Sequence, residues 1–127
     1  MSGQVIHFEI PADDPERNYA FYQDVFGWRI NAMPEMEYAL VQTADTDETG
    51  AVTTPGAING GMLRRQGAIT GPVITISTDD LEATLAHVEK AGGTIVVPRT
   101  AVGDMGFSAY ITDPEGNVVG LWQNADA

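Results

Sequence analysis

The sequence predicts an α+β fold built from two pseudo-symmetric βαβββ modules. The main observation is an internal repeat. Residues 7–14 align with residues 73–80, and the similarity continues along the residues that follow each of these two segments. The identical pairs are Ile10/Ile76, Asp13/Asp79, Asp14/Asp80, Glu16/Glu82, Ala20/Ala86 and Gly27/Gly93. Two copies are too few for a solenoid, so we expect them to pair around one shared core and to place a site between them.

Each copy opens with a candidate strand. Residues 5–10 alternate between two faces, which puts His7 and Glu9 together on the face opposite the apolar side chains. Residues 73–77 repeat this alternation, with Val73 at the position of His7. The two copies therefore share a strand pattern but differ in the chemistry of one face.

An amphipathic helix is predicted after each strand. In the first copy, Asp13 or Asp14 is a candidate N-cap and Gly27 is a candidate stop. The apolar stripe between them consists of Tyr19, Tyr22 and Phe26. We expect this stripe to face the sheet. In the second copy, residues 79–80 and 92–93 have the same capping and stopping roles.

Three short strand candidates follow each helix and complete the βαβββ pattern. They are residues 28–33, 37–43 and 58–64 in module one (about 4–65), and residues 94–98, 107–112 and 117–123 in module two (about 71–124). The last two are joined by a Asp-Pro-Glu-Gly type I turn signature at 113–116. Residues 44–57 form a longer connection rich in Asp, Thr and Gly, which predicts a mobile surface loop able to act as a lid.

The composition limits the class of protein. Its 127 residues fit a single domain spanning 1–127. A formal net charge of −12 argues against nucleic acid and anionic membranes as partners, because both attract clustered Lys and Arg. The absence of cysteine excludes disulfides and thiol chemistry, and no apolar run is long enough to span a membrane. We expect a cytoplasmic protein.

Several motifs in this order resemble the vicinal oxygen chelate superfamily. They are HFEIPADD at 7–14, FYQDVFGW at 21–28 and DPEGN at 113–117. That superfamily includes glyoxalase I, extradiol dioxygenases, fosfomycin-resistance enzymes and bleomycin-resistance proteins. The resemblance implies two modules whose curled mixed sheets enclose a cleft, and it implies a homodimer, as in many relatives. In metal-dependent members, residues of the first and last strands hold a divalent ion in the cleft.

The resemblance places those ligand positions in this sequence at His7 and Gly61 in module one and at Val73 and Gly120 in module two. Only His7 can coordinate a metal, whereas a catalytic divalent site usually needs about three protein ligands. A different site in which Glu37 or Asp104 joins His7 and Glu9 is disfavoured, because two residues alternating in a strand have no specific spacing. No metal and no cofactor are therefore expected.

His7 and Glu9 are the candidate catalytic residues. His7 is either a buried, hydrogen-bonded histidine inherited from a metal-binding ancestor or a cleft base whose pKa responds to Glu9. Trp122 is either a pocket wall, with Gly61 and Gly120 leaving room beside it, or ordinary core. The predicted ligand-binding residues are His7, Glu9, Tyr38, Gly61, Val73, Gly120 and Trp122.

These observations favour a metal-independent small-molecule binding protein that resembles bleomycin-resistance proteins. The acidic charge and an aromatic wall suit a cationic or planar ligand. The alternative is a glyoxalase-like lyase or isomerase acting on a small substrate, so the sequence leaves open whether the protein is an enzyme.

Overall fold

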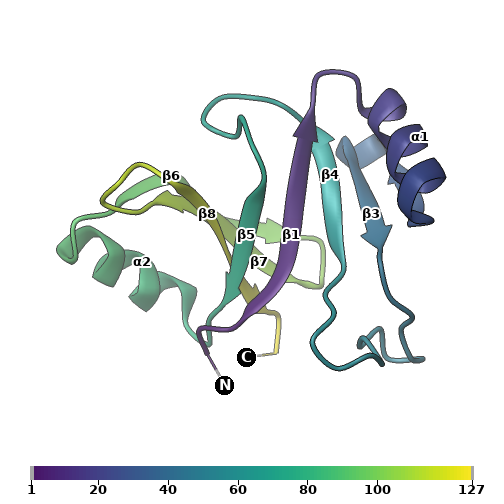
Figure 1. Ribbon diagram of the computed structural model, residues 1–127. Helices are drawn as coiled ribbons and strands as arrows, with labels where there is room; N and C mark the ends of the chain where they lie inside the picture. Colours follow the sequence, from purple (N-terminus) through teal and green to yellow (C-terminus); the bar gives the residue numbers. More distant parts are fainter. Residues whose placement is uncertain (1, 127) are drawn as a thin grey trace. The chain divides into compact units, whose positions relative to one another are not determined.

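The computed structural model describes residues 2–126 and contains the predicted order of elements. The first copy consists of β1 (Val5–Ala12), α1 (Pro15–Phe26), β2 (Arg29–Met33), the 3-10 helix η1 (Pro34–Met36), β3 (Tyr38–Gln42) and β4 (Gly60–Arg64). The second consists of β5 (Val73–Ser77), α2 (Leu81–Lys90), β6 (Thr94–Val102), β7 (Gly106–Thr112) and β8 (Val118–Asn124). The α+β class and the duplicated βαβββ pattern are thus confirmed (Figure 1).

The chain divides into two compact units. The N-terminal unit is His7–Pro72, and the C-terminal unit is Val73–Ala127 together with Met1–Ile6. The first residues join the C-terminal unit through Ser77, whose carbonyl accepts the Gly3 N–H at 2.7 Å and whose own N–H donates to the Gln4 carbonyl at 2.9 Å. The boundary therefore lies inside β1 rather than before it, which differs from the predicted modules.

Each unit has the same strand order. In the N-terminal unit the order is β2-β3-β4-β1, and in the C-terminal unit it is β6-β7-β8-β5. In both, the first and last strands of the copy pair in parallel, β1 with β4 and β5 with β8, while the other neighbours are antiparallel. The internal repeat of the sequence is therefore a repeat of topology, with mixed sheets as predicted.

The helices begin and end at residues that the sequence indicated. The Asp14 side chain accepts the Arg17 N–H at the start of α1, and Gly27, with φ of 72°, ends this helix in the left-handed conformation that favours glycine. Asp80 caps α2 by accepting the Ala83 N–H at 3.0 Å. The open alternatives at both helix starts are thus settled in favour of the second aspartate of each pair.

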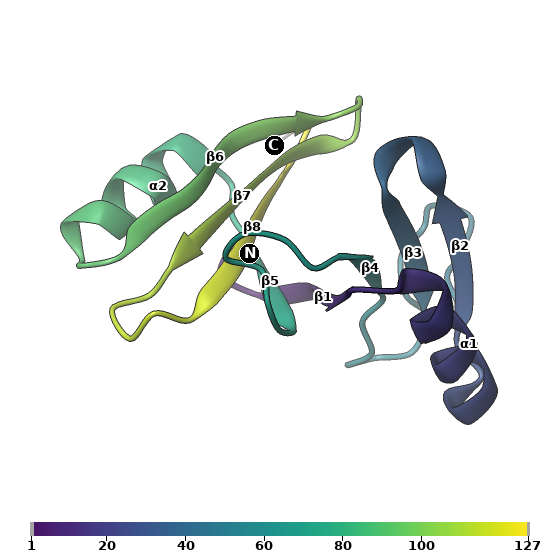
Figure 2. The same cartoon turned by 90° about the horizontal axis from the view of Figure 1, so that it is seen from above.

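Each unit has its own cluster of buried apolar side chains. In the N-terminal unit, Ala39, Val41 and Met62 form the buried cluster, and Tyr19, Tyr22 and Trp28 are among the side chains packed against it. In the C-terminal unit the cluster consists of Leu81, Leu85, Ala109, Ile111 and Leu121. Figure 2 shows α2 running beside β6 and β7. Of these two strands, β7 supplies Ala109 and Ile111 of the cluster, and β6 packs Ile95 against it. An interior shared by both units stays a prediction.

One helix residue was wrongly predicted to be core. Phe26 is 59% exposed, because it occupies the last position of α1, where the sheet no longer covers the helix stripe. Its ring instead stacks on Tyr22, with ring centroids 5.9 Å apart. Tyr19 and Tyr22 do pack against the cluster, as expected.

The strand β6 is longer than predicted and irregular. It continues past Pro98 to Val102, and its pairing with β7 shifts register between Val97 and Thr100. A proline lacks the N–H that a sheet ladder uses, so it is tolerated in an edge strand or at a bulge. The position of β6 at the end of the strand order meets this condition.

Within residues 2–126, none of the helices is both long and apolar enough to cross a membrane.

Replacing Leu81 with alanine should lower the free energy of unfolding by about 2 to 5 kcal/mol, because this fully buried side chain would leave a cavity. Chemical denaturation followed by circular dichroism measures the loss. Leu40→Ala is the control, since Leu40 is 45% exposed and its truncation should cost less than about 1 kcal/mol. Two separate transitions, only one of them moved by Leu81→Ala, would contradict the single domain predicted for residues 1–127.

Candidate functional site

The site in the N-terminal unit begins with the alternation of β1. Phe8 and Ile10 pack against the buried cluster of this unit, so His7 and Glu9 lie on the other face of the strand. Glu9 is 6% exposed, and His7 is partly buried. The sequence-based placement of these two side chains on one face is therefore correct.

Tyr38 reaches the same face from β3. Ala39 and Val41 of the same strand belong to the buried cluster, so Tyr38 lies on the opposite face. The Tyr38 hydroxyl donates a hydrogen bond to Glu9 Oε2 at 2.7 Å. The Tyr38 hydroxyl oxygen also lies 2.8 Å from His7 Nε2. One phenol oxygen thus joins the histidine to the carboxylate.

The bonds that Tyr38 makes to His7 and Glu9 are absent from the predictions made from the sequence, although the direction of the Tyr38 side chain has a signal there. Small and β-branched residues at Ala39 and Val41 indicate the core face of the strand, which places Tyr38 opposite them. Alternation could therefore have fixed the direction of the ring. It could not have fixed the partners, because these depend on the register between β3, β4 and β1.

Gly61 makes room for the tyrosine. Gly61 pairs with Glu9 on one side and with Leu40 on the other, at the centre of this sheet. A Cβ atom added at Gly61 would lie 1.8 Å from Tyr38 Oη and 2.1 Å from its Cζ, which is far inside contact distance. The prediction that Gly61 leaves open space is wrong, since the Tyr38 side chain fills that space.

Burial lowers the pKa of the His7 imidazole below its ordinary value, and the negative charge of Glu9 opposes this shift without cancelling it. The imidazole is consequently neutral at pH 7. A neutral imidazole carries one N–H and one acceptor nitrogen, so it fits a hydrogen bond with a hydroxyl group.

Val73, Gly120 and Trp122 lie in the C-terminal unit, on β5 and β8. Gly120 pairs with Thr75, and Trp122 pairs with Ser77, so Gly120 and Trp122 share one face of β8. A Cβ atom added at Gly120 would lie 2.8 Å from the Thr75 hydroxyl oxygen, so this position also has a near neighbour. Val73 is buried, at 2% exposure.

Trp122 is partly exposed rather than buried. Its indole N–H donates to Asn124 Oδ1 at 2.7 Å. Gly106 accommodates the ring, because a Cβ atom there would lie 2.7 Å from Trp122 Cζ2. This role of Gly106 is recognisable only in the structure, through its position diagonal to Trp122 across β7 and β8.

The residues at the expected ligand positions do not fit a metal ion. Gly61, Gly120 and Val73 have no donor side chain, and His7 Nε2 already faces the Tyr38 hydroxyl. Among the residues that the structure describes, no three His, Cys, Asp or Glu side chains are grouped as a metal site requires. Glu37, with φ of 51°, lies in the turn before β3, and Asp104 lies in the turn before β7.

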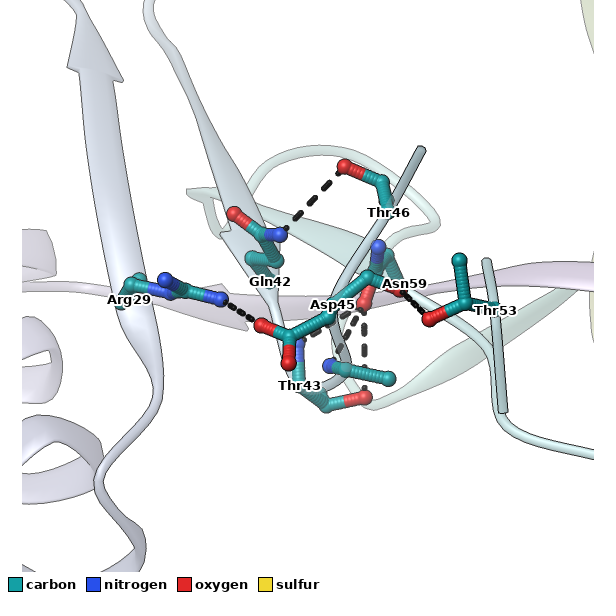
Figure 3. Close-up of polar contacts among 8 residues, drawn as sticks. Arg29, Gln42, Thr43, Asp45, Thr46, Thr53 and Asn59 are labelled. Carbon is teal, nitrogen blue, oxygen red and sulfur yellow. Dashed lines mark hydrogen bonds and ion pairs between the residues drawn. The ribbon is translucent and has the colours of Figure 1, made fainter. Parts of the chain in front are cut away.

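The 44–57 connection has more internal structure than predicted. Asn59 Oδ1 accepts the Thr43 N–H at 2.8 Å and the Ala44 N–H at 3.0 Å, which fastens the start of the connection to its end. Arg29 on β2 forms an ion pair with Asp45 (Figure 3). A short bridge between Thr46 and Val52 closes the loop upon itself. Its role as a lid stays a prediction.

Comparison with known proteins agrees with this architecture. Residues 4–44 match the family described as Bleomycin resistance protein-like N-terminal. A glyoxylase-like domain-containing protein of Didymella fabae is 35% identical over 122 residues, which is 92% of this chain and 91% of that protein. The lactoylglutathione lyase of Haemophilus influenzae is 28% identical over 125 residues, covering 95% of this chain and 93% of that protein.

Longer relatives and solved structures extend the comparison. Two mycobacterial proteins described as glyoxylase CFP32, from Mycobacterium bovis and Mycobacterium tuberculosis, are 30% identical over 115 residues, and this chain spans only 43% of their length. A Streptomyces coelicolor methylmalonyl-CoA epimerase has the same fold, with a TM-score of 0.67, 19% identity, and coverage of 98% of this chain and 96% of that one. The chain belongs to the glyoxylase-like family of the vicinal oxygen chelate superfamily.

Gly61→Ala should destabilise the protein by about 1 to 3 kcal/mol, because the new methyl group displaces Tyr38 from its place between His7 and Glu9. The same substitution in a Tyr38→Ala background should cost less than about 0.5 kcal/mol, since the obstructing ring is gone. Urea denaturation of the four proteins gives this coupling. Gly71→Ala is a matched control, because a Cβ atom at Gly71 meets nothing within 4 Å.

His7 should make stability depend on pH. Its folded-state pKa lies below the ordinary value of 6.5, so in the interval between the two the unfolded chain binds a proton that the folded chain does not. The stability that neutral His7 allows is fully present above pH 6.5, and it decreases as the pH falls below 6.5 towards the folded-state pKa. Replacing His7 with glutamine should flatten the pH profile of unfolding free energy in this interval. An equal flattening by His87→Gln would contradict the assignment.

Proposed function

We propose that this protein binds a small molecule without a metal ion, in the manner of bleomycin-resistance proteins, and does not transform it. The observation that carries this proposal is the Tyr38 hydroxyl, which lies within hydrogen-bond distance of both His7 and Glu9 and covers Gly61. His7, which stands at one of the positions where metal-dependent relatives hold an ion, here faces the Tyr38 hydroxyl instead. His7, Tyr38 and Glu9 together form a preformed polar cluster. Such a cluster supplies the few oriented polar groups that a small-molecule site requires.

The charge of the chain favours a cationic or planar ligand. The formal net charge is −12, and the site contains the carboxyl group of Glu9. A cation would be attracted to a protein with this negative charge, whereas an anion would be repelled. The partly exposed indole of Trp122 offers a flat surface on which an aromatic ligand can stack.

The family match supports a binding role. The matched segment, residues 4–44, contains His7, Glu9 and Tyr38, so the whole polar cluster lies within the part of the chain that is similar to bleomycin-resistance proteins. Gly61 lies outside that segment, on β4, and leaves the space that the Tyr38 side chain fills. Val73, Gly120 and Trp122 belong to the proposed ligand-binding set as well.

A glyoxalase-like lyase or isomerase is the second candidate. The similarity to a lactoylglutathione lyase over 95% of this chain favours it, as does a histidine and a carboxylate joined through a hydroxyl, which are groups able to move a proton. In this reading His7 and Glu9 are the catalytic residues. We further propose that the chain is one domain, forms a homodimer and functions in the cytoplasm, without nucleic acid or membrane partners.

Ligand binding should change the fluorescence of Trp122. The chain has two tryptophans, so a Trp28→Phe variant leaves Trp122 as the only indole. We expect this variant to respond to at least one member of a panel of cationic and planar aromatic compounds that includes bleomycin, with calorimetry giving the affinity. NMR of the recovered compound should show no chemical change, whereas turnover would favour the lyase or isomerase.

The same preparation tests metal independence. After soaking in zinc, nickel, manganese or iron and then dialysis, elemental analysis should find well under one equivalent of metal, because one histidine supplies too few ligands. A retained equivalent that is lost in a His7→Gln variant would overturn the metal-free proposal. The binding proposal would be overturned if no compound of the panel changed the Trp122 fluorescence or gave a binding signal in calorimetry.

A further inference from the structure

The hydrogen bonds of the polar cluster have a defined direction. The Tyr38 hydroxyl has one hydrogen, and it is donated to Glu9 Oε2. Its oxygen can then take part in the 2.8 Å contact with His7 Nε2 only as an acceptor. The hydrogen in that contact must come from the imidazole, so Nε2 carries it.

This direction leaves the other ring nitrogen as an acceptor. A neutral imidazole has one protonated and one unprotonated nitrogen, and burial keeps His7 neutral by lowering its pKa. With the hydrogen on Nε2, the lone pair that can accept a hydrogen bond is on Nδ1. The carboxyl group of Glu9, acting through Tyr38, therefore selects which nitrogen of His7 can serve as a base or acceptor.

Nδ1 is accessible from outside the protein. It forms no hydrogen bond with any described residue of the chain. Within residues 2–126, however, no buried side-chain nitrogen or oxygen lacks a hydrogen-bond partner. Because His7 is only partly buried, these two facts together require that solvent reaches Nδ1. An oriented acceptor with no protein partner is a natural contact point for a ligand.

We propose that His7 Nδ1 is the hydrogen-bond acceptor through which this protein takes its ligand, and that Tyr38 and Glu9 are positioning residues that hold the proton on Nε2. The ligand class follows from this assignment: a compound that presents an N–H or O–H donor, either cationic or neutral. A carboxylate offers only acceptors at neutral pH and cannot make this contact. The ligand class rests on the proposed binding function, whereas the proton position does not.

The proton position is tested by NMR of protein labelled with 15N at histidine, with His7 assigned from the His7→Gln spectrum. At neutral pH we expect the Nε2 resonance of a protonated nitrogen and the Nδ1 resonance of an unprotonated one. The proton on Nε2 should exchange slowly with water, because the Tyr38 oxygen holds it. An unprotonated Nε2 in the parent protein would overturn the assignment.

Tyr38→Phe tests the positioning role. It removes the hydroxyl and keeps the ring, so the signal of the slowly exchanging Nε2 proton should be lost. Tyr22→Phe is the matched control. Tyr22 belongs to α1 and packs against the buried cluster, on the face of the sheet away from His7. Removing its hydroxyl should therefore leave the Nε2 proton signal in place. Persistence of the signal in Tyr38→Phe would overturn the role of Tyr38.

The ligand class is tested with two compounds that share a ring, benzamidinium as the donor and benzoate as the acceptor. Benzamidinium should shift the Nδ1 resonance at least ten times more strongly than benzoate at equal concentration. An equal or larger response to benzoate would overturn the donor class. If neither compound shifts Nδ1 while other ligands of the panel bind, the ligand contact is overturned but the binding function survives. If nothing in the panel binds, the binding function fails and the proton position is judged by the spectra alone.

Discussion

The contact between the Tyr38 oxygen, His7 and Glu9 is the interaction on which the chemistry of the N-terminal unit depends. A carboxyl group that is 6% exposed needs a partner, because a buried charge or polar group without one is costly. Tyr38 supplies a donor to Glu9 and an acceptor to His7 with a single oxygen. The whole arrangement fits only because position 61 has no side chain.

The duplicated topology explains why these residues meet. In both units the first strand of the copy pairs in parallel with the last. In the N-terminal unit this places Glu9 of β1 beside Gly61 of β4, and β3 pairs with the other side of β4. The same order in the C-terminal unit brings Thr75 beside Gly120. The two equivalent glycines, Gly61 and Gly120, thus have different neighbours, a long phenol in one unit and a short hydroxyl in the other. One scaffold has acquired two chemically distinct faces.

Much of this structure could be predicted from the sequence, and the exceptions have physical reasons. The repeat, the caps and the alternation of β1 are local patterns, and they correctly gave the element order, the helix starts and the shared face of His7 and Glu9. The bond between Tyr38 and His7 depends on strand register across three strands, which no local pattern specifies. Phe26 continues a helical stripe past the end of the surface that could cover it, so periodicity alone overstated its burial. The length of β6 was underestimated because a proline usually ends a strand, whereas an edge strand can absorb it in a bulge.

The irregularity of β6 has a consequence for how copies of this protein meet one another. A regular outer strand exposes a row of unpaired N–H and C=O groups on which another chain can add a strand. In β6, Pro98 has no N–H to donate, and the register is shifted twice, once between Ile95 and Val97 and once between Val97 and Thr100. An incoming strand would find no continuous ladder to extend. The outer edge of this sheet is thus protected against uncontrolled stacking of molecules, and a mutation that replaced Pro98 by a β-branched residue would weaken a safeguard against aggregation rather than the fold itself.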